Sequence, residues 1–584
     1  MRSLARRSLV LLALVALALG AFGAAAPAAL ARHGGFDPTK TTVRGIDVDR
    51  TTIPQLQSLM NRHRLTSAQL TQFYLDRIRR LNPKLHAVIK VAPTALAQAR
   101  LADRARRFGI RLPLLGIPVI VKDNIDTRDM PTTAGSFALK GSQPGDSFIV
   151  KRLRAAGAIV IAKANLSEWA NFRSAPSSSG WSGIGGQTNL AYVLDRNPCG
   201  SSSGSGVAVS ADLATVGVGT ETDGSIVCPS GANGLVGIKP TLGLLSRAGV
   251  VPISADQDTA GPMARNVTDA AVLLGVLTGI DPKDPATAAQ AGHAFRNYRQ
   301  FLDKHALEGA RIGVWRQDTY NDSTKATAEP ILADVIATLQ AQGATVVDPT
   351  NIDISATFTN EGPALSCEFK TDIAKYLRTY TRPRFPKTLQ QLIAFNVAHP
   401  NLEGPWNNAV FEGAQATNGR DSACAALRAA TTPPVQASIN QVMASNDLDA
   451  IIALTNGPAW VTSSDPTKGD LDGDFSLFIG SSTASAVSGY GSITVPAAFV
   501  GHLPVGISFI GGRWSEPDLI GFAYDFEQAT HVRVPPTFLP TETASAAAAS
   551  AAAARSAAGT PASADAKRAA LPGRNHHWRM PPLR

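Results

Sequence analysis

The chain has 584 residues, of which 44% are hydrophobic and 17% are charged. This balance is that of a globular protein with a large core, and it excludes a chain that is disordered throughout. The formal net charge is +10, but the first seven residues contribute +3 and the residues after Pro540 contribute a net +4. The body between them carries only +3, which excludes the extended basic surface that nucleic-acid binding requires.

Residues 1–31 have the three parts of a secretory signal peptide. Three arginines among the first seven residues form a positive start, residues 8–23 are apolar, and residues 29–31 (ALA) form a small-residue cleavage site. We therefore expect export to the periplasm or the extracellular space, without stable membrane association. A single N-terminal anchor helix is the alternative, because the apolar run approaches the ~20 residues that span a bilayer.

Beyond residue 50 the hydrophobic pattern alternates between helical and extended segments. Thr66-Ser67 is typical of a helix start and Asn82-Pro83 of a helix end. Short apolar runs at Ile117–Val121 and Ala450–Leu454 predict buried strands. Further strands are expected at 86–91, 158–162, 311–315 and 344–347, and further helices up to about residue 107, over 146–156 and over 325–342. This alternation predicts an α/β fold with a covered, largely mixed sheet.

Residues 166–263 interrupt this pattern, because they are rich in Gly, Ser and Asn and poor in charge. A flexible linker has such a composition. The segment also contains apolar runs, such as Ala214–Val218 and Leu235–Ile238, that a linker does not need. We therefore favour a folded region of loops and helices, in which glycines let the backbone approach a ligand closely.

A change in composition also marks the end of the chain. We expect one folded domain over residues 32–535 and a tail over residues 536–584 that is rich in alanine and basic at its end. Such a tail is typical of disorder. An alanine-rich helix is the alternative.

The cysteines are Cys199, Cys228, Cys367 and Cys424. Export permits disulfides, and four cysteines allow three pairings, between which the sequence does not choose. We favour Cys367 with Cys424, while a bridge between Cys199 and Cys228 would constrain the serine-rich region. The chain has no CxxC and no HExxH, so a metal site has little support.

Three polar residues in this part of the chain are candidates for chemistry. Ser201 and Ser225 lie in glycine-flanked turns, and Lys122 follows the apolar run IPVIV. Burial can lower the pKa of a lysine by ~3–5 units from ~10.4, which would make it a general base. The alternative, which composition alone favours, is a strand-end lysine paired with Asp123 or Asp126.

A serine hydroxyl needs a neighbour that accepts its proton. No histidine lies in the glycine-rich region, which favours a Ser–Lys arrangement over a Ser-His-Asp triad. Gly200–Gly204 also matches G-x-S-x-G, which would make Ser202 a nucleophile. That motif requires a preceding strand, and Asp195–Pro198 is not predicted to form a strand.

Three motifs in order resemble the amidase signature family: GIPVIVKDNID around Lys122, the block of serines and glycines at 200–206, and GTETDGSIVCPSGANGLVGIKPTLG at 219–243. Ser201 follows Lys122 by 79 residues and Ser225 follows Ser201 by 24. The resemblance extends from about residue 50 to about residue 530. It implies a large mixed, twisted sheet with helices on both faces.

The resemblance also implies a role for each residue. Lys122 would be the base, Ser201 the bridging serine on a cis peptide, and Ser225 the nucleophile. The backbone N–H groups of Thr222, Asp223, Gly224 and Ser225 would form the oxyanion hole. Neither a metal nor an organic cofactor would be needed.

Within the family, NLSEWANFR, SGWS and GGQTN at residues 165–189 are most similar to the bacterial peptide amidases. Glu221, Asp223 and Val227 depart from the commoner pattern in the direction of that subgroup. The resemblance thus implies a monomer that releases ammonia from C-terminal peptide amides. Fatty-acid, aryl or small aliphatic amides are alternative substrates, and a tRNA-dependent amidotransferase subunit or an inactive binding module are alternatives of another class.

Overall fold

A computed structural model describes residues 36–174, 177–316, 322–404, 406–462 and 480–542. The chain divides into two units, residues 1–40 and 41–584. In the first unit, residues 36–40 include a turn in which Lys40 donates its N–H to the carbonyl of Asp37. All the elements below belong to the second unit.

The described residues of the second unit form a mixed sheet of eleven strands in the order β12-β11-β13-β15-β14-β9-β10-β8-β4-β5-β3. The strands are β3 (Val88–Val91), β4 (Pro118–Lys122), β5 (Ile159–Ala164), β8 (Val216–Glu221), β9 (Val236–Lys239), β10 (Thr259–Ala264), β11 (Arg311–Val314), β12 (Thr345–Val347), β13 (Ala450–Leu454), β14 (Ser492–Val500) and β15 (Leu503–Ile510). Two small antiparallel pairs are β1 (Thr42–Val43) with β2 (Ile46–Asp47), and β6 (Trp181–Ser182) with β7 (Gly186–Gln187).

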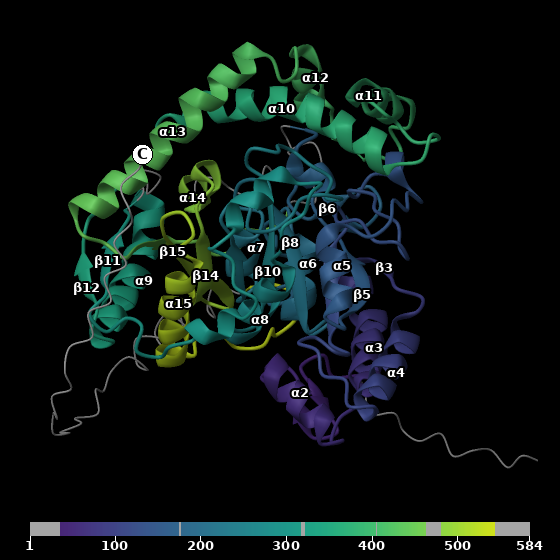
Figure 1. Cartoon of the computed structure of the whole chain (residues 1–584), viewed down its shortest axis with the longest axis vertical. Coiled ribbons are helices and arrows are strands. Elements are labelled where there is room, and N and C mark those ends of the chain that lie inside the picture. The colour runs from purple at the N-terminus through teal and green to yellow at the C-terminus, as the bar shows by residue number, and fades with distance from the viewer. Residues whose placement is uncertain (1–35, 175–176, 317–321, 405, 463–479, 543–584) are drawn as a thin grey trace, which may run out of the picture. The chain divides into compact units, whose positions relative to one another are not determined.

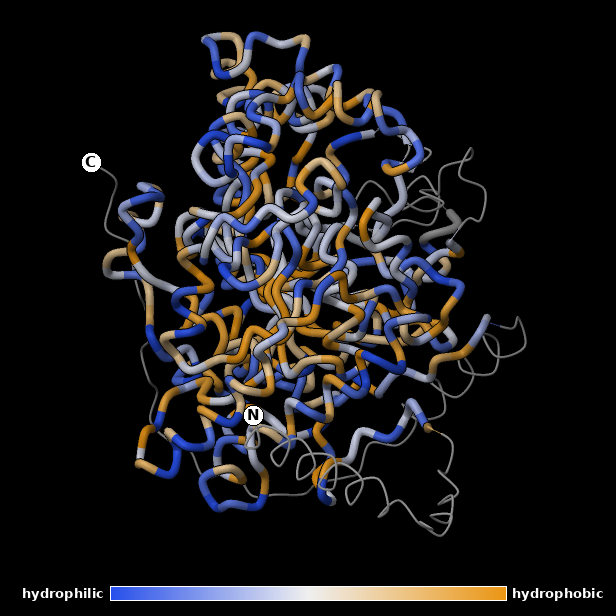
Figure 2. Tube along the Cα trace, turned by 90° about the vertical axis from the view of Figure 1, so that its right-hand side faces the viewer, coloured by the Kyte–Doolittle hydropathy of each residue, from blue (hydrophilic) through white to orange (hydrophobic). Residues whose placement is uncertain are grey.

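Helices flank this sheet (Figure 1). They are α2 (Ile53–Asn61), α3 (Ser67–Leu85), α4 (Ala95–Arg107), α5 (Phe148–Ala155), α6 (Ser203–Ser210), α7 (Val227–Ala232), α8 (Val267–Leu277), α9 (Asp322–Ala341), α10 (Thr357–Tyr380), α11 (Leu389–Ala398), α12 (Ala409–Ala416), α13 (Ser422–Ser445), α14 (Ser482–Ser488) and α15 (Glu516–Thr530). Hydrophobic residues gather along the sheet in the interior of the unit (Figure 2). The predicted α/β class and the mixed sheet are confirmed.

Strand direction brings two distant motifs to one edge of the sheet. β4 runs parallel to β8, with Val121 opposite Val218. Parallel neighbours end at the same edge, so Lys122 at the end of β4 comes close to the end of β8. The glycine-rich segment 166–263 is folded as predicted: it holds α6, β8, α7, β9 and β10, and most of its residues are buried.

Helices α10 to α13 form a separate group, called here the helical group, which is seen across the top of Figure 1. Part of this group packs, together with residues such as Leu139 and Trp169, in an apolar cluster separate from that of the sheet, in which Phe369 and Phe411 stack with ring centroids 5.4 Å apart. The Tyr376 hydroxyl of α10 donates to Asp126, which follows β4, at 2.6 Å. The group therefore packs over the carboxyl end of β4.

Two sequence predictions need correction at their edges. Asn82-Pro83 does not end α3, which continues to Leu85 because Asn82 bonds both backbone groups of Val88 and His86 closes the turn at φ +49°. The structured part of the chain also passes residue 535. Leu539 donates its N–H to the carbonyl of Tyr192 at 3.1 Å and packs in that tyrosine's apolar cluster.

Among the described residues, no helix is long and apolar enough to cross a membrane. The predicted signal peptide and most of the predicted tail lie outside these residues.

Candidate active site

Lys122 lies at the end of β4 with a fully buried side chain. Its ammonium nitrogen lies 2.8 Å from Ser201 Oγ, 2.9 Å from Thr220 Oγ1 and 3.2 Å from the Thr220 carbonyl oxygen. No described carboxylate forms an ion pair with it, and Asp123 pairs with Lys163 instead, at 3.1 Å. The interpretation of Lys122 as a strand-end lysine paired with Asp123 or Asp126 is therefore wrong.

The surroundings of Lys122 change its protonation. Burial lowers the pKa of its amine to about 7, although the charges of Glu221 and Asp258 act in the opposite direction. An ordinary lysine has a pKa near ~10.4. At neutral pH a substantial fraction of Lys122 is therefore unprotonated and able to accept a proton from Ser201.

Ser201 is fully buried, and its peptide bond to Gly200 is cis. A Cβ at position 200 would lie 2.4 Å from Ser167 Oγ, so a side chain there would require the surrounding serine side chains to shift. The carbonyl of Ser201 accepts the N–H of Ser167 at 3.1 Å. Ser201 thus lies in a closely packed loop directly before α6.

Ser225 lies in the turn between β8 and α7, and its relative exposure is 8%. Its carbonyl accepts the N–H of Ser202 at 3.2 Å, which joins the two serine loops. Its hydroxyl donates no hydrogen bond to a described residue. The structure thus brings Lys122 and Ser201 into contact and places Ser225 on the adjoining loop, without a hydrogen bond between the two serine hydroxyls.

Residues 222–225, called here the 222–225 turn, offer free backbone donors. None of their four N–H groups donates to another described residue. Gly224 is the one residue of the turn in the left-handed region, at φ +80°, and Asp223 is not in that region. The replacement of glycine by aspartate at 223 therefore does not strain the backbone of this turn.

Hydrogen bonds of the Glu221 and Asp223 carboxylates connect the turn to neighbouring segments. Glu221 Oε2 accepts the N–H groups of Ile226 and Val227, at 2.7 and 3.0 Å. Asp223 accepts the hydroxyls of Ser482 and Thr483 at the start of α14, at 2.5 and 2.8 Å.

Asp258 holds the first residue of the turn, because it accepts the Thr222 hydroxyl at 2.6 Å. Burial raises the pKa of this carboxyl to about 6, against the hydrogen bond from Thr222. A second buried titratable group near the turn is Lys239, whose pKa burial lowers to about 8 despite the charge of Glu221.

Both pairs of cysteines are bridged. The predicted pair Cys367–Cys424 is confirmed and joins α10 to α13. The other bridge, Cys199–Cys228, closes a separation of 29 residues. Because Cys199 precedes Ser201 by two residues and Cys228 follows Ser225 by three, this disulfide ties the two serine loops together.

A cavity of about 500 Å³ adjoins the helical group, and it holds none of the three predicted catalytic residues. Half of its lining residues are charged, and more than half belong to α13: Asp256, Glu368, Arg420, Asp421, Cys424, Ala425, Arg428, Ala429, Thr432 and Pro433. Among the described residues, no group of three or more His, Cys, Asp or Glu side chains has the arrangement of a metal site.

Comparison with known proteins agrees with these motifs. The model of the Amidase family matches residues 69–520. A protein of Arabidopsis thaliana named a probable amidase is 41% identical over 506 residues, which cover 84% of this chain and 92% of the relative. A glutamyl-tRNA(Gln) amidotransferase subunit of Pseudomonas aeruginosa is 31% identical over 499 residues, with 83% and 99% covered.

A solved structure is also similar. The native peptide amidase from Stenotrophomonas maltophilia is 45% identical, with 84% of this chain and 99% of that chain covered, at a TM-score of 0.78. The family match and the shared fold agree on one assignment. The chain belongs to the amidase signature family and is an amide-hydrolysing enzyme.

Proposed function

We propose that this enzyme deamidates the C-terminal amides of peptides through Lys122, Ser201 and Ser225. The observation that carries the proposal is the buried contact of 2.8 Å between the Lys122 amine and the Ser201 hydroxyl, in surroundings that lower the pKa of the amine to about 7. The neutral amine of Lys122 is hydrogen-bonded to the Ser201 hydroxyl, and Ser201 adjoins the loop of Ser225. This arrangement is suited to activating Ser225 as a nucleophile.

In this mechanism Ser225 attacks the amide carbonyl and passes its proton to Ser201, which passes its own proton to Lys122. The free N–H groups of the 222–225 turn stabilise the oxyanion, and each such donor is typically worth ~3–4 kcal/mol of barrier. The protons return along the same path to the leaving nitrogen, the C–N bond breaks and ammonia leaves. Water then hydrolyses the ester between the acyl group and Ser225.

The proposed substrate class rests on similarity. The Stenotrophomonas maltophilia protein, 45% identical to this chain, is a peptide amidase. Asp223, unlike a glycine, ties the turn to α14 through Ser482 and Thr483, so this departure from the common motif has a structural use. The similarity favours peptide amides over fatty-acid, aryl or small aliphatic amides.

The test is the initial rate of amine release by the purified mature enzyme from a panel of amides, measured as ammonia from the primary amides and as aniline from the anilide. The panel contains a C-terminally amidated dipeptide, the C-terminal anilide of the same dipeptide, a long-chain fatty amide and propionamide. We expect the highest kcat/KM on the amidated dipeptide. A higher kcat/KM on the anilide or the fatty amide would overturn the peptide-amide assignment and keep the reaction class.

We also propose that the mature chain is an exported monomer. The pattern of residues 1–31 supports export, and disulfides such as the two in this chain form in oxidising compartments. Mass spectrometry of the N-terminus should find cleavage after residue 31, and light scattering should give the mass of one chain. A membrane-bound protein that retains residues 1–31 would favour the anchor helix instead.

Removal of the Cys199–Cys228 bridge is expected to lower both stability and activity. A bridge across 29 residues stabilises the fold by about 3–4 kcal/mol through the entropy of the unfolded chain. The double variant Cys199→Ser/Cys228→Ser should therefore lose stability in urea unfolding. Its kcat should fall by about tenfold at a temperature where it is fully folded, because misplaced reacting groups slow catalysis. Unchanged kcat in the folded variant would show that the bridge does not align the serine loops.

A further inference from the structure

Gln257 is a buried residue of the loop before β10, with a relative exposure of 2%. Its Nε2 donates to the carbonyl oxygen of Thr222 at 3.0 Å and to Glu361 Oε1 at 2.6 Å. Its Oε1 accepts from the Arg428 guanidinium at 2.7 Å. The orientation of the amide follows from its partners, since a carbonyl oxygen only accepts and a guanidinium only donates.

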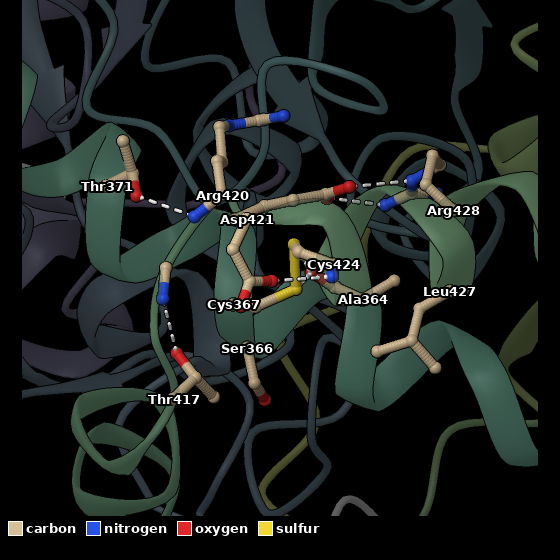
Figure 3. Close-up of a disulfide and its surroundings, with 12 residues drawn as sticks. Ala364, Ser366, Cys367, Thr371, Thr417, Arg420, Asp421, Cys424, Leu427 and Arg428 are labelled. Atoms are coloured by element: carbon tan, nitrogen blue, oxygen red, sulfur yellow. Dashed lines mark hydrogen bonds and ion pairs between the residues drawn. A yellow bond between two sulfur atoms is a disulfide. The ribbon is translucent and has the colours of Figure 1, made fainter.

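The partners of Gln257 are themselves held rigidly. Arg428 on α13 forms a two-point contact with Glu368 on α10, at 2.8 and 2.6 Å, and such bidentate pairs fix the planes of both groups. Next to this pair, Cys367 and Cys424 are bridged, with Cys424 one helical turn before Arg428 (Figure 3). The helical group therefore offers a braced support on which the amide of Gln257 is fixed.

The contact with Thr222 bears on the direction of a donor in the 222–225 turn. The carbonyl of Thr222 and the N–H of Asp223 belong to one planar peptide unit, in which the oxygen and the hydrogen point in opposite directions. A hydrogen bond that fixes the oxygen therefore also fixes the direction of the N–H. Gln257 holds the side of this peptide that faces the helical group, and the Asp223 N–H, which has no described acceptor, points the other way.

We propose that Gln257 is a positioning residue, which aims the Asp223 N–H at the oxyanion by holding the carbonyl of Thr222 against the braced pair of Arg428 and Glu368. This inference rests on the proposed function. It assigns a catalytic consequence to α10 and α13, which supply none of the three reacting side chains.

The test compares two buried glutamines. Gln257→Leu removes the amide at the turn, and Gln290→Leu is the matched control. Gln290 is equally buried, and its Nε2 bonds the carbonyls of Gly243 and Gly279 at 3.3 and 3.0 Å, away from the serine loops. A third variant, Gln257→Glu, keeps an acceptor for Arg428 and has no N–H for Thr222. For each protein we measure Tm, kcat and KM on the amidated dipeptide, and inhibition by a peptidyl trifluoromethyl ketone and by the product acid.

We expect kcat to fall about 100-fold in Gln257→Leu and in Gln257→Glu, with little change in KM, because a misaimed oxyanion donor acts on the transition state. Affinity for the trifluoromethyl ketone, which forms an oxyanion on addition of a serine, should fall with kcat/KM, and affinity for the product acid should not. Gln290→Leu should lower Tm and leave kcat unchanged.

Wild-type kcat in a folded Gln257 variant would overturn the inference, as would a loss confined to KM or an equal loss of kcat in Gln290→Leu. If Gln257→Leu does not fold, the isosteric Gln257→Glu decides by the same readouts. Failure of the proposed function is a separate result: it would appear as a wild-type enzyme that releases no ammonia from the amidated dipeptide.

Discussion

Replacement of Ser225 by alanine is expected to lower kcat by about 10⁴-fold or more, since loss of the nucleophile removes the acyl-enzyme route altogether. The fold should remain intact, because the Ser225 hydroxyl makes no hydrogen bond to a described residue. Ammonia release from the amidated dipeptide measures the loss. Mass spectrometry after reaction with a fluorophosphonate measures the covalent adduct, which the variant should not form.

Ser202→Ala is the matched control for this prediction. Ser202 is the serine that the G-x-S-x-G pattern would make the nucleophile. It is fully buried, and its hydroxyl bonds both backbone groups of Thr220, at 3.1 and 3.2 Å. That position gives Ser202 a structural role, so Ser202→Ala should lose some stability and keep the fluorophosphonate adduct on Ser225. An adduct on Ser202, or full activity of Ser225→Ala, would contradict the assignment.

Local patterns in the sequence predict much of the fold. The strand Ala450–Leu454 is found at its predicted bounds, because a short apolar run that contains two adjacent β-branched isoleucines favours a buried strand. The predicted helix start at Thr66 is a capping box in the structure: Thr66 and Gln69 satisfy each other's backbone N–H groups. Such signals depend only on residues that are close together in the sequence, so they can be recognised from the sequence alone.

The three proposed catalytic residues could also be selected from the sequence. Lys122 ends an apolar run, and each serine lies in a glycine-rich turn, so burial and close packing could be expected for all three. Chemistry could not be chosen on composition alone, since a strand-end lysine paired with an aspartate has the same pattern. The distance to Ser201 and the lack of a described carboxylate partner exclude the ion pair with Asp123 or Asp126.

The supports of the 222–225 turn could not be predicted. Gln257 contacts Thr222 across 35 positions, Arg428 contacts Gln257 across 171, and Ser482 contacts Asp223 across 259. Periodicity and turn chemistry carry no signal for contacts at these separations. Thr220, which accepts a hydrogen bond from Lys122, lies inside the recognised motif and was missed because nothing in the motif marks which side chain faces the lysine.

Lys122→Met is expected to lower kcat by about 10⁴-fold, the upper end of what a general base contributes. In the proposed mechanism, only the neutral amine of Lys122 accepts the proton of Ser201. With a pKa of about 7, kcat/KM should therefore rise with pH through about 7 and level off above it. Initial rates of ammonia release from pH 5 to 9 measure this limb.

Two other buried groups titrate in the same range, Asp258 with a pKa of about 6 and Lys239 with a pKa of about 8. Lys239→Met and Asp258→Asn therefore serve as controls: both should keep a rising limb near pH 7, whatever their rates at the plateau. A limb that disappears in Lys239→Met while Lys122→Met stays active would assign the base to Lys239.

The lowered pKa of Lys122 also makes the free energy of unfolding depend on pH. Its folded-state pKa of about 7 lies below the ~10.4 of an unfolded lysine, so between these values the unfolded chain binds more protons than the folded one. Wild-type stability therefore gains from Lys122 as the pH rises through this window, and Lys122→Met removes that gain. Urea unfolding of both proteins at pH 7 and pH 9 should show the wild type gaining more stability than the variant between the two pH values. An equal gain in both proteins would mean that Lys122 stays protonated in the folded state, and an ammonium at neutral pH could not accept the proton that the mechanism assigns to it.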